Sequence, residues 1–150
     1  MSFLAQNKKA FVDYEIKEKL EAGIVLTGAE VKSVRLGHAS LKGSFVEISE
    51  KNEAFVRNLY ISPYKQTAIK DYLPERKRKL LLKQKEIIDL GSQLKTKSII
   101  VIALDLHLSR NRIKVTLGLC KAKKKYDRRE ELRKKAQNLE IDRALKKYRN

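Results

Sequence analysis

Residues that bind metal ions or carry out nucleophilic and acid–base catalysis are scarce in this chain of 150 residues. One cysteine, Cys120, and two histidines, His38 and His107, are too few for a zinc site, and no second cysteine is present for an internal disulfide. No glycine-rich loop of the kind that cradles phosphates is present either. We therefore expect no enzymatic activity, no metal and no other cofactor.

Long apolar segments are also lacking. The longest apolar run, Ile99 to Leu104, has six residues, whereas a membrane-spanning helix needs about 20. The first residues do not contain the apolar stretch of a signal peptide. A single cysteine fits a reducing cytosol. We expect a cytoplasmic protein with one folded domain and a tail, acting as a monomer without membrane contact.

Acidic residues are outnumbered almost two to one, because 35 lysines and arginines face 18 aspartates and glutamates. The formal net charge is +17. Such an excess points to a polyanionic partner, either nucleic acid or an anionic membrane surface. Residues 121–150 contain 13 basic and 5 acidic residues, a net of +8, and residues 1–120 carry the other +9. Two basic regions predict two contact regions.

The apolar patterns predict a mainly β body with three short helices. We expect helices over residues 14–22, 28–37 and 74–91, since Ile16 and Leu20 lie four residues apart and Pro74 and Gly91 suit a helix start and end. Strands are expected over residues 24–26, 44–49, 54–61, 98–108 and 113–120. This order favours a barrel or sandwich, and we expect a small closed β-barrel of oligonucleotide-binding (OB-like) type with flanking helices over residues 1–122.

The basic tail, residues 123–150, has a different pattern. Its apolar residues up to Leu139 fall on one side of a helical projection, and those from Ile141 onward fall on the opposite side. A helix packed on the body or lying on a membrane would need one continuous apolar face. We therefore expect a tail that is disordered when free and helical when bound to a charged partner, and nucleic acid becomes the favoured partner.

Three segments resemble the SsrA-binding protein family, also called small protein B, in the order expected of that family. The first is the opening block, residues 7–45, which contains GAEVKSVR. The second is the central RKRKLLL followed by KEI, and the third is IKVTLGLCKAKKKYDRRE, residues 113–130. The chain departs from the family pattern at Ala29, where threonine is usual, and at Gly43, where aspartate is common.

The resemblance implies a protein that binds the transfer-RNA-like portion of transfer-messenger RNA and carries it to stalled ribosomes for trans-translation. It implies that the body contacts this RNA while the tail probes the empty messenger channel and decoding centre of the small subunit. The RNA-binding residues that it implies are Lys8, Gly28, Glu30, Val31, Lys32, Ser33, Arg35, Arg76, Arg78 and Lys79. The tail residues that it implies at the decoding centre are Lys123, Lys124, Tyr126, Asp127, Arg128 and Arg129.

The acidic Glu30 is unusual in this set, because an acid at an RNA surface repels phosphate. Two alternatives remain open from the sequence: a contact with a base or ribose hydroxyl, or a structural ion pair. Two other functions remain as well. A ribosomal protein or translation factor with an OB-like barrel would be equally basic, and an RNA-processing enzyme would need a catalytic pair that the sequence does not offer.

Overall fold

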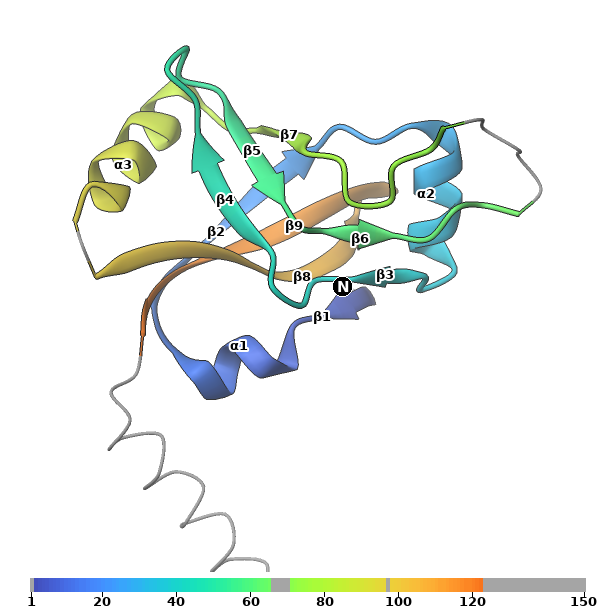
Figure 1. Ribbon diagram of the computed structural model, residues 1–150, viewed down its shortest axis with the longest axis horizontal. Coiled ribbons are helices and arrows are strands. Elements are labelled where there is room, and N and C mark those ends of the chain that lie inside the picture. Colours follow the sequence, from blue (N-terminus) through green and yellow to red (C-terminus); the bar gives the residue numbers. More distant parts are fainter. Residues whose placement is uncertain (1, 66–70, 97, 123–150) are drawn as a thin grey trace, which may run out of the picture.

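The computed structural model describes residues 2–65, 71–96 and 98–122 (Figure 1). The helices are α1 (Lys8–Asp13), α2 (Gly28–Arg35) and α3 (Gln84–Leu94). The strands are β1 (Ser2–Gln6), β2 (Tyr14–Ile24), β3 (Ala39–Ser40), β4 (Phe45–Ile48), β5 (Ala54–Arg57), β6 (Tyr60–Ile61), β7 (Arg78–Leu81), β8 (Ile99–Ser109) and β9 (Arg112–Ala122). The mainly β fold with flanking helices is confirmed.

Seven of these strands form one antiparallel sheet in the order β1-β8-β9-β2-β7-β5-β4, while β3 pairs with β6 in a second, two-stranded sheet. The large sheet curls so that β4 lies across β8 (Figure 1). The two edges, β1 and β4, do not pair with each other in the described residues. The sheet is therefore open, where the sequence predicted a closed barrel. The edge strands have only five and four residues, and side-chain packing of β4 on β8 covers the interior without joining the edges by hydrogen bonds.

The centre of the sheet is built from β2, β8 and β9, which have 11 residues each. Strands β8 and β9 are joined by a two-residue turn, and Arg110 and Asn111 both have positive φ, 51° and 64°, as hairpins of this length require. A side chain at Gly118 of β9 would place its Cβ 2.7 Å from Cδ1 of Leu104 on β8. Glycine therefore allows these strands to pack closely.

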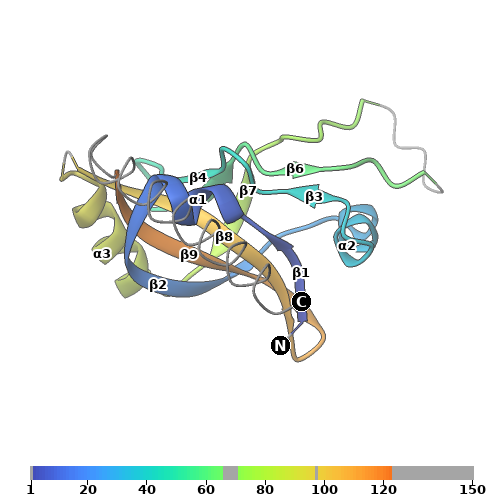
Figure 2. The same ribbon diagram turned by 90° about the horizontal axis from the view of Figure 1, so that it is seen from below.

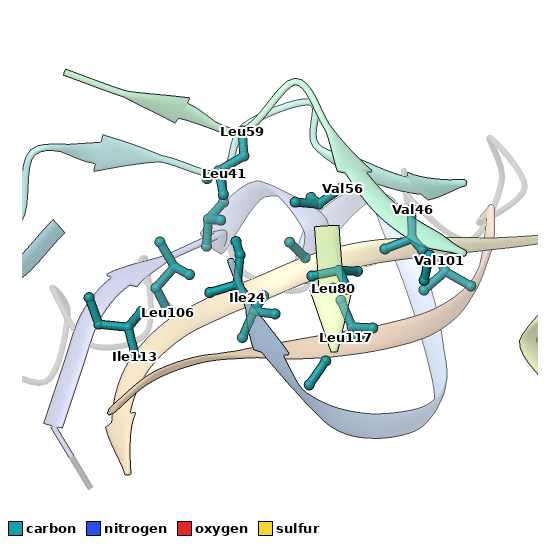
Figure 3. Packing of buried hydrophobic residues seen from close by; sticks show 14 of the residues in the cluster. Ile24, Leu41, Val46, Val56, Leu59, Leu80, Val101, Leu106, Ile113 and Leu117 are labelled. Carbon is teal, nitrogen blue, oxygen red and sulfur yellow. The ribbon is translucent and has the colours of Figure 1, made fainter. Parts of the chain in front are cut away.

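Apolar side chains of the strands meet in a large core (Figure 3), and Ala10, Ile102, Leu104 and Cys120 form a second, smaller cluster. Strand residues that are buried in the large core include Ile24, Val56, Leu80, Leu106 and Leu117. Helix α2 adds Val34, which is 0% exposed, and α3 adds Ile87 and Leu90. Each such side chain contributes about 1.5–3 kcal/mol when it is fully buried. The core therefore fixes how α2 lies against the sheet, and α2 carries most of the predicted RNA-binding residues.

Two of the predicted helices are wrong in whole or in part. Residues 14–22 lie in strand β2, because the alternating positions Ile16, Leu20 and Ala22 turn toward the interior. Residues 74–91 are divided between β7 and α3. Strand β7 alternates buried Arg78 and Leu80 with exposed neighbours, and α3 begins only after Lys83. The predicted helix over 28–37 is confirmed as α2, Gly28–Arg35.

Within the described ranges, none of the helices is long and apolar enough to cross a membrane. Those ranges also contain no cluster of three or more His, Cys, Asp or Glu side chains placed to hold a metal ion. Cys120 is buried at the end of β9, and burial raises the pKa of its thiol to about 11. The thiol is therefore protonated at neutral pH, and Cys120 packs in a buried apolar cluster.

His107 of β8 lies between two carboxylates. Its Nδ1 is 2.7 Å from Oδ1 of Asp105 and its Nε2 is 2.9 Å from Oε2 of Glu21, and Lys114 also pairs with Glu21 at 3.2 Å. Thr116 donates a hydrogen bond of 2.9 Å to Asp105. Burial alone would lower the pKa of His107, but the two carboxylates outweigh it and the pKa is raised. The His107 side chain joins β2 to β8 through these contacts.

The raised pKa predicts a pH-dependent contribution of His107 to stability. A group whose folded pKa is raised stabilises fully below its unfolded pKa, about 6.5, and loses that contribution as the pH rises through the folded pKa. The difference in unfolding free energy between the native chain and His107→Gln should therefore be larger near pH 6 than near pH 9, in urea titrations at both pH values. A difference that does not change with pH would show that folding does not raise the pKa of His107.

Candidate nucleic-acid interface

Helix α2 begins with a reciprocal pair of hydrogen bonds. The side-chain Oγ1 of Thr27 accepts from the backbone N–H of Glu30 at 3.2 Å, and the backbone N–H of Thr27 donates to Oε1 of Glu30 at 2.9 Å. This capping box satisfies two donors that a helix start leaves unpaired. Glu30 is therefore oriented by its own helix before it meets any distant partner.

Glu30 is also the acceptor of a buried network with Tyr72, Arg76 and Arg78, here called the Glu30 network. Arg76 donates to Oε1 of Glu30, and Nε of Arg78 donates to Oε2 at 2.7 Å. The hydroxyl of Tyr72 shares its single proton between the carbonyl of Ile61 at 2.9 Å and Oε2 of Glu30 at 3.3 Å. Both carboxylate oxygens are thus occupied, and the side chain is 1% exposed. In the structure Glu30 forms the ion pair that was one of its two alternatives.

Arg78 binds the rest of this region together through its planar guanidinium group. The group is 0% exposed and donates to the carbonyls of Leu59 at 2.6 Å, Pro74 at 3.0 Å and Arg76 at 3.2 Å. A guanidinium group can donate in several fixed directions at once, which a lysine cannot reproduce. Arg78 therefore joins β7 and the segment before it to α2 and to the residue that precedes β6.

The electrostatics of the network favour the ionised carboxylate. Burial alone would raise the pKa of Glu30, but hydrogen bonds from Arg76, the backbone of Thr27 and Arg78 outweigh it, so the pKa is lowered. Burial, followed by the nearby charge of Glu30, raises the pKa of the Tyr72 hydroxyl. At neutral pH the network therefore contains one carboxylate, two guanidinium groups and a neutral phenol.

The outer side of α2 presents a basic stripe to solvent, here called the α2 face. It consists of Gly28, Lys32, Arg35 and Leu36, which are all exposed and recur at the spacing of one helix side. Nζ of Lys32 lies 5.5 Å from the centre of the Tyr64 ring, and Arg35 donates to the carbonyl of Asn111 at 3.3 Å. Figure 1 shows α2 at one end of the molecule, beside the segment that follows β6. This face offers cations next to an aromatic ring.

The other predicted RNA-binding residues lie in different surroundings. Ser33 is buried in the inner side of α2, and Val31 is half-buried. Lys8 is exposed at the start of α1, and Lys79 is exposed on β7, where Nζ lies 3.6 Å from Oε2 of Glu53. The structure thus brings Glu30, Arg76 and Arg78 together, and it covers Glu30, Ser33 and Arg78 with protein. The predicted tail residues 123–129 lie outside the described residues.

Tyr64 and Tyr72 have different contacts in the structure, although the sequence gives no reason to distinguish them. Both Tyr64 and Tyr72 stand beside polar residues, where a tyrosine more often packs structurally than stacks on a base. The structure places the Tyr72 hydroxyl in the Glu30 network and the Tyr64 ring under Lys32. No sequence signal distinguishes them, because each depends on a partner more than 30 positions earlier in the chain.

Comparisons with known proteins agree over nearly the whole chain. The family model described as SmpB protein matches residues 4–147. An SsrA-binding protein of Aquifex aeolicus is 49% identical over 95% of this chain and 91% of its own length, and one of Syntrophobacter fumaroxidans is 46% identical over 97% and 90%. A solved chain described under "tmRNA-SmpB: a journey to the center of the bacterial ribosome" superposes with a TM-score of 0.68 at 41% identity, covering 80% of this chain and 84% of that one.

Proposed function

The chain belongs to the SmpB protein family, and on that premise we propose that it binds transfer-messenger RNA and delivers it to stalled ribosomes for trans-translation. The relatives are named for binding SsrA RNA, and the similar solved chain is described with that RNA on the bacterial ribosome. The single observation in this chain that supports the proposal most is the α2 face, a basic stripe held rigidly by the Glu30 network.

The ten predicted RNA-binding residues divide into two roles in this proposal. Lys32, Arg35 and Arg76 contact phosphates, with Gly28 allowing close approach of the RNA backbone and Lys8 and Lys79 extending the basic surface. Glu30, Ser33 and Arg78 are buried and Val31 packs against the core, so these four act as positioning residues that hold α2 and the segment from Tyr72 to Arg78 in place. Lysines and arginines at phosphates give affinity without reading sequence, and a rigid surface recognises folded RNA by shape.

The body and the tail have separate tasks. Residues 1–122 form an OB-like body that binds the transfer-RNA-like portion, and the curled antiparallel sheet supports this type with an open edge in place of closure. Residues 123–150 are disordered when free and become helical in the empty messenger channel, where Lys123, Lys124, Tyr126, Asp127, Arg128 and Arg129 reach the decoding centre. The protein works in the cytoplasm and makes or breaks no covalent bond.

The α2 face is tested by Lys32→Ala combined with Arg35→Ala. Both side chains are exposed, so the melting temperature should stay near that of the native chain. Affinity for the transfer-RNA-like portion should fall by about tenfold or more, and the slope of log K against log salt should become shallower by about 1.4–1.8, since each lost phosphate contact contributes about 0.7–0.9. Filter binding or fluorescence titration over a salt series measures both.

The matched control is Lys51→Ala with Lys85→Ala, which removes the same charge from the exposed β4–β5 turn and α3. Affinity and salt slope should change little in this control. If both double variants lose affinity equally, binding depends on net charge alone and the α2 face is not the site. If the native chain binds unrelated hairpins as tightly as the transfer-RNA-like portion, the proposed function itself fails.

A further inference from the structure

A cavity of about 680 Å³ lies on the body where α1, the start of β8, β4 and the end of α3 come together. We call it the tail-root cavity, and it is lined by Tyr14, Phe45, Leu94, Ile100 and their neighbours. Phe45 and Ile100 remain 40% and 36% exposed, although they stand beside the core. An aromatic ring and an aliphatic side chain facing an open cavity form a surface on which a planar group can stack.

The charged groups of the cavity are mostly basic. Lys9 of α1 and Lys42 from the loop before β4 line it, and neither forms an ion pair within the described residues. The only lining carboxylate among those residues is Asp13. The Oγ of Ser44, another lining residue, is buried and has no hydrogen-bond partner in that part of the chain. The cavity thus combines an apolar wall with two lysines that have no ion-pair partner among the described residues.

The tail-root cavity lies beside the end of β9, where the tail begins, and away from the α2 face. Ala122, the last described residue of β9, pairs with Tyr14, which lines the cavity. Figures 1 and 2 show α1 and α3 toward one side and α2 at the opposite end of the molecule. An RNA that covers α2 would therefore leave the cavity open, and the cavity lies beside the point at which the chain continues into residues 123–150.

We propose that the tail-root cavity binds one unstacked nucleotide of small-subunit ribosomal RNA. The base stacks on Phe45 and Ile100, and its phosphates lie at Lys9 and Lys42. This inference rests on the proposed function, because that function brings the tail root to the ribosome. The tail itself is a poor occupant, since residues 121–150 carry a net +8 and the two lysines would repel it.

The test compares three variants of the full chain: Phe45→Ala, Phe45→Tyr, and Lys9→Ala with Lys42→Ala. Lys51→Ala with Lys85→Ala serves again as the charge-matched control. Two affinities are measured for each protein: that for the transfer-RNA-like portion alone, and that of the complex with transfer-messenger RNA for ribosomes with an empty messenger channel. Melting temperatures check folding, and ultraviolet crosslinking of the native complex identifies what touches the peptide containing Phe45.

Phe45→Ala and the lysine pair should weaken association with the ribosome by about tenfold, as the loss of one stacked base or of two phosphate contacts predicts. Phe45→Tyr keeps the ring and should bind like the native chain, and no variant should lose affinity for the transfer-RNA-like portion. The crosslink should join residues near Phe45 to small-subunit ribosomal RNA.

Three results would overturn the inference: unchanged ribosome association in all variants, an equal loss with the Lys51 and Lys85 control, or a crosslink to transfer-messenger RNA or to a protein. Failure of the proposed function gives a different result. In that case the native chain itself does not bind the transfer-RNA-like portion, or its complex does not associate with ribosomes.

Discussion

Glu30→Ala should lower the free energy of unfolding by about 3–5 kcal/mol, because it leaves a buried guanidinium group without its counter-ion. Arg78 is 0% exposed, and two of its nitrogens point to Oε2 of Glu30, at 2.7 and 2.5 Å. The variant also removes the hydrogen bond that Glu30 accepts from the backbone N–H of Thr27, while Oγ1 of Thr27 still caps the backbone N–H of residue 30. Urea unfolding followed by circular dichroism measures the loss.

The control for Glu30→Ala is Glu47→Ala, which breaks an exposed ion pair. Oε1 of Glu47 lies 3.1 Å from Arg57, and both side chains are 40% exposed or more, so its loss should cost at most about 1 kcal/mol. Equal losses in the two variants would show that the Glu30 network contributes no more than a surface ion pair. RNA affinity is then measured well below the melting temperature, where a positioning role predicts weaker binding from Glu30→Ala as well.

The lowered pKa of Glu30 adds a pH signature to this expected loss. A carboxyl group whose folded pKa is depressed stabilises fully above its unfolded pKa, about 4.3, and loses that contribution as the pH falls through the folded value. The native chain should therefore lose stability in acid more steeply than Glu30→Gln does. Arg76, Arg78 and Tyr72 surround the carboxylate, so its protonation breaks the same contacts that the alanine variant removes.

Most strands of the sheet could be predicted from the sequence, but the helices of the protein could be predicted only in part. The strand predicted from the alternation of residues 113–120 and the helix predicted over residues 28–37 correspond to β9 and α2. The spacing of Ile16 and Leu20 does not discriminate, because four residues are one helical turn and also two strand periods. Which side of that segment is buried depends on β9, whose residues lie about 100 positions further on.

In the candidate interface, too, the sequence does not show which of several neighbouring basic residues are buried and which are exposed. Arg76, Arg78 and Lys79 belong to one basic run, and the sequence treats them alike. In the structure Arg78 is buried, Arg76 is one-third exposed, and Lys79 is exposed on the opposite side of β7. The difference follows from the strand period and from Glu30, 48 positions earlier. A basic run therefore predicts a polyanionic partner, while the tertiary contacts decide which of its residues can meet that partner.

Truncation after Lys125 should leave the body folded and able to bind transfer-messenger RNA, while tagging of stalled peptides should be abolished. All the described helices and strands end by Ala122, so the change in unfolding free energy should stay within about 0.5 kcal/mol. Body and tail act as two linked contacts on the ribosome in the proposed function. Loss of one linked contact commonly weakens association by about 10²–10⁴-fold.

The truncated chain is compared with the full chain and with Arg128→Ala combined with Arg129→Ala. The double variant keeps the tail but removes two charges that we place at the decoding centre, so its tagging should fall between that of the other two. Affinity for the transfer-RNA-like portion should be the same in all three, because the α2 face is intact. An in vitro translation assay on a message without a stop codon measures tagging, and filter binding measures the affinity. If the truncated chain unfolds, or if it tags as well as the full chain, then the tail supports the body and does not probe the messenger channel.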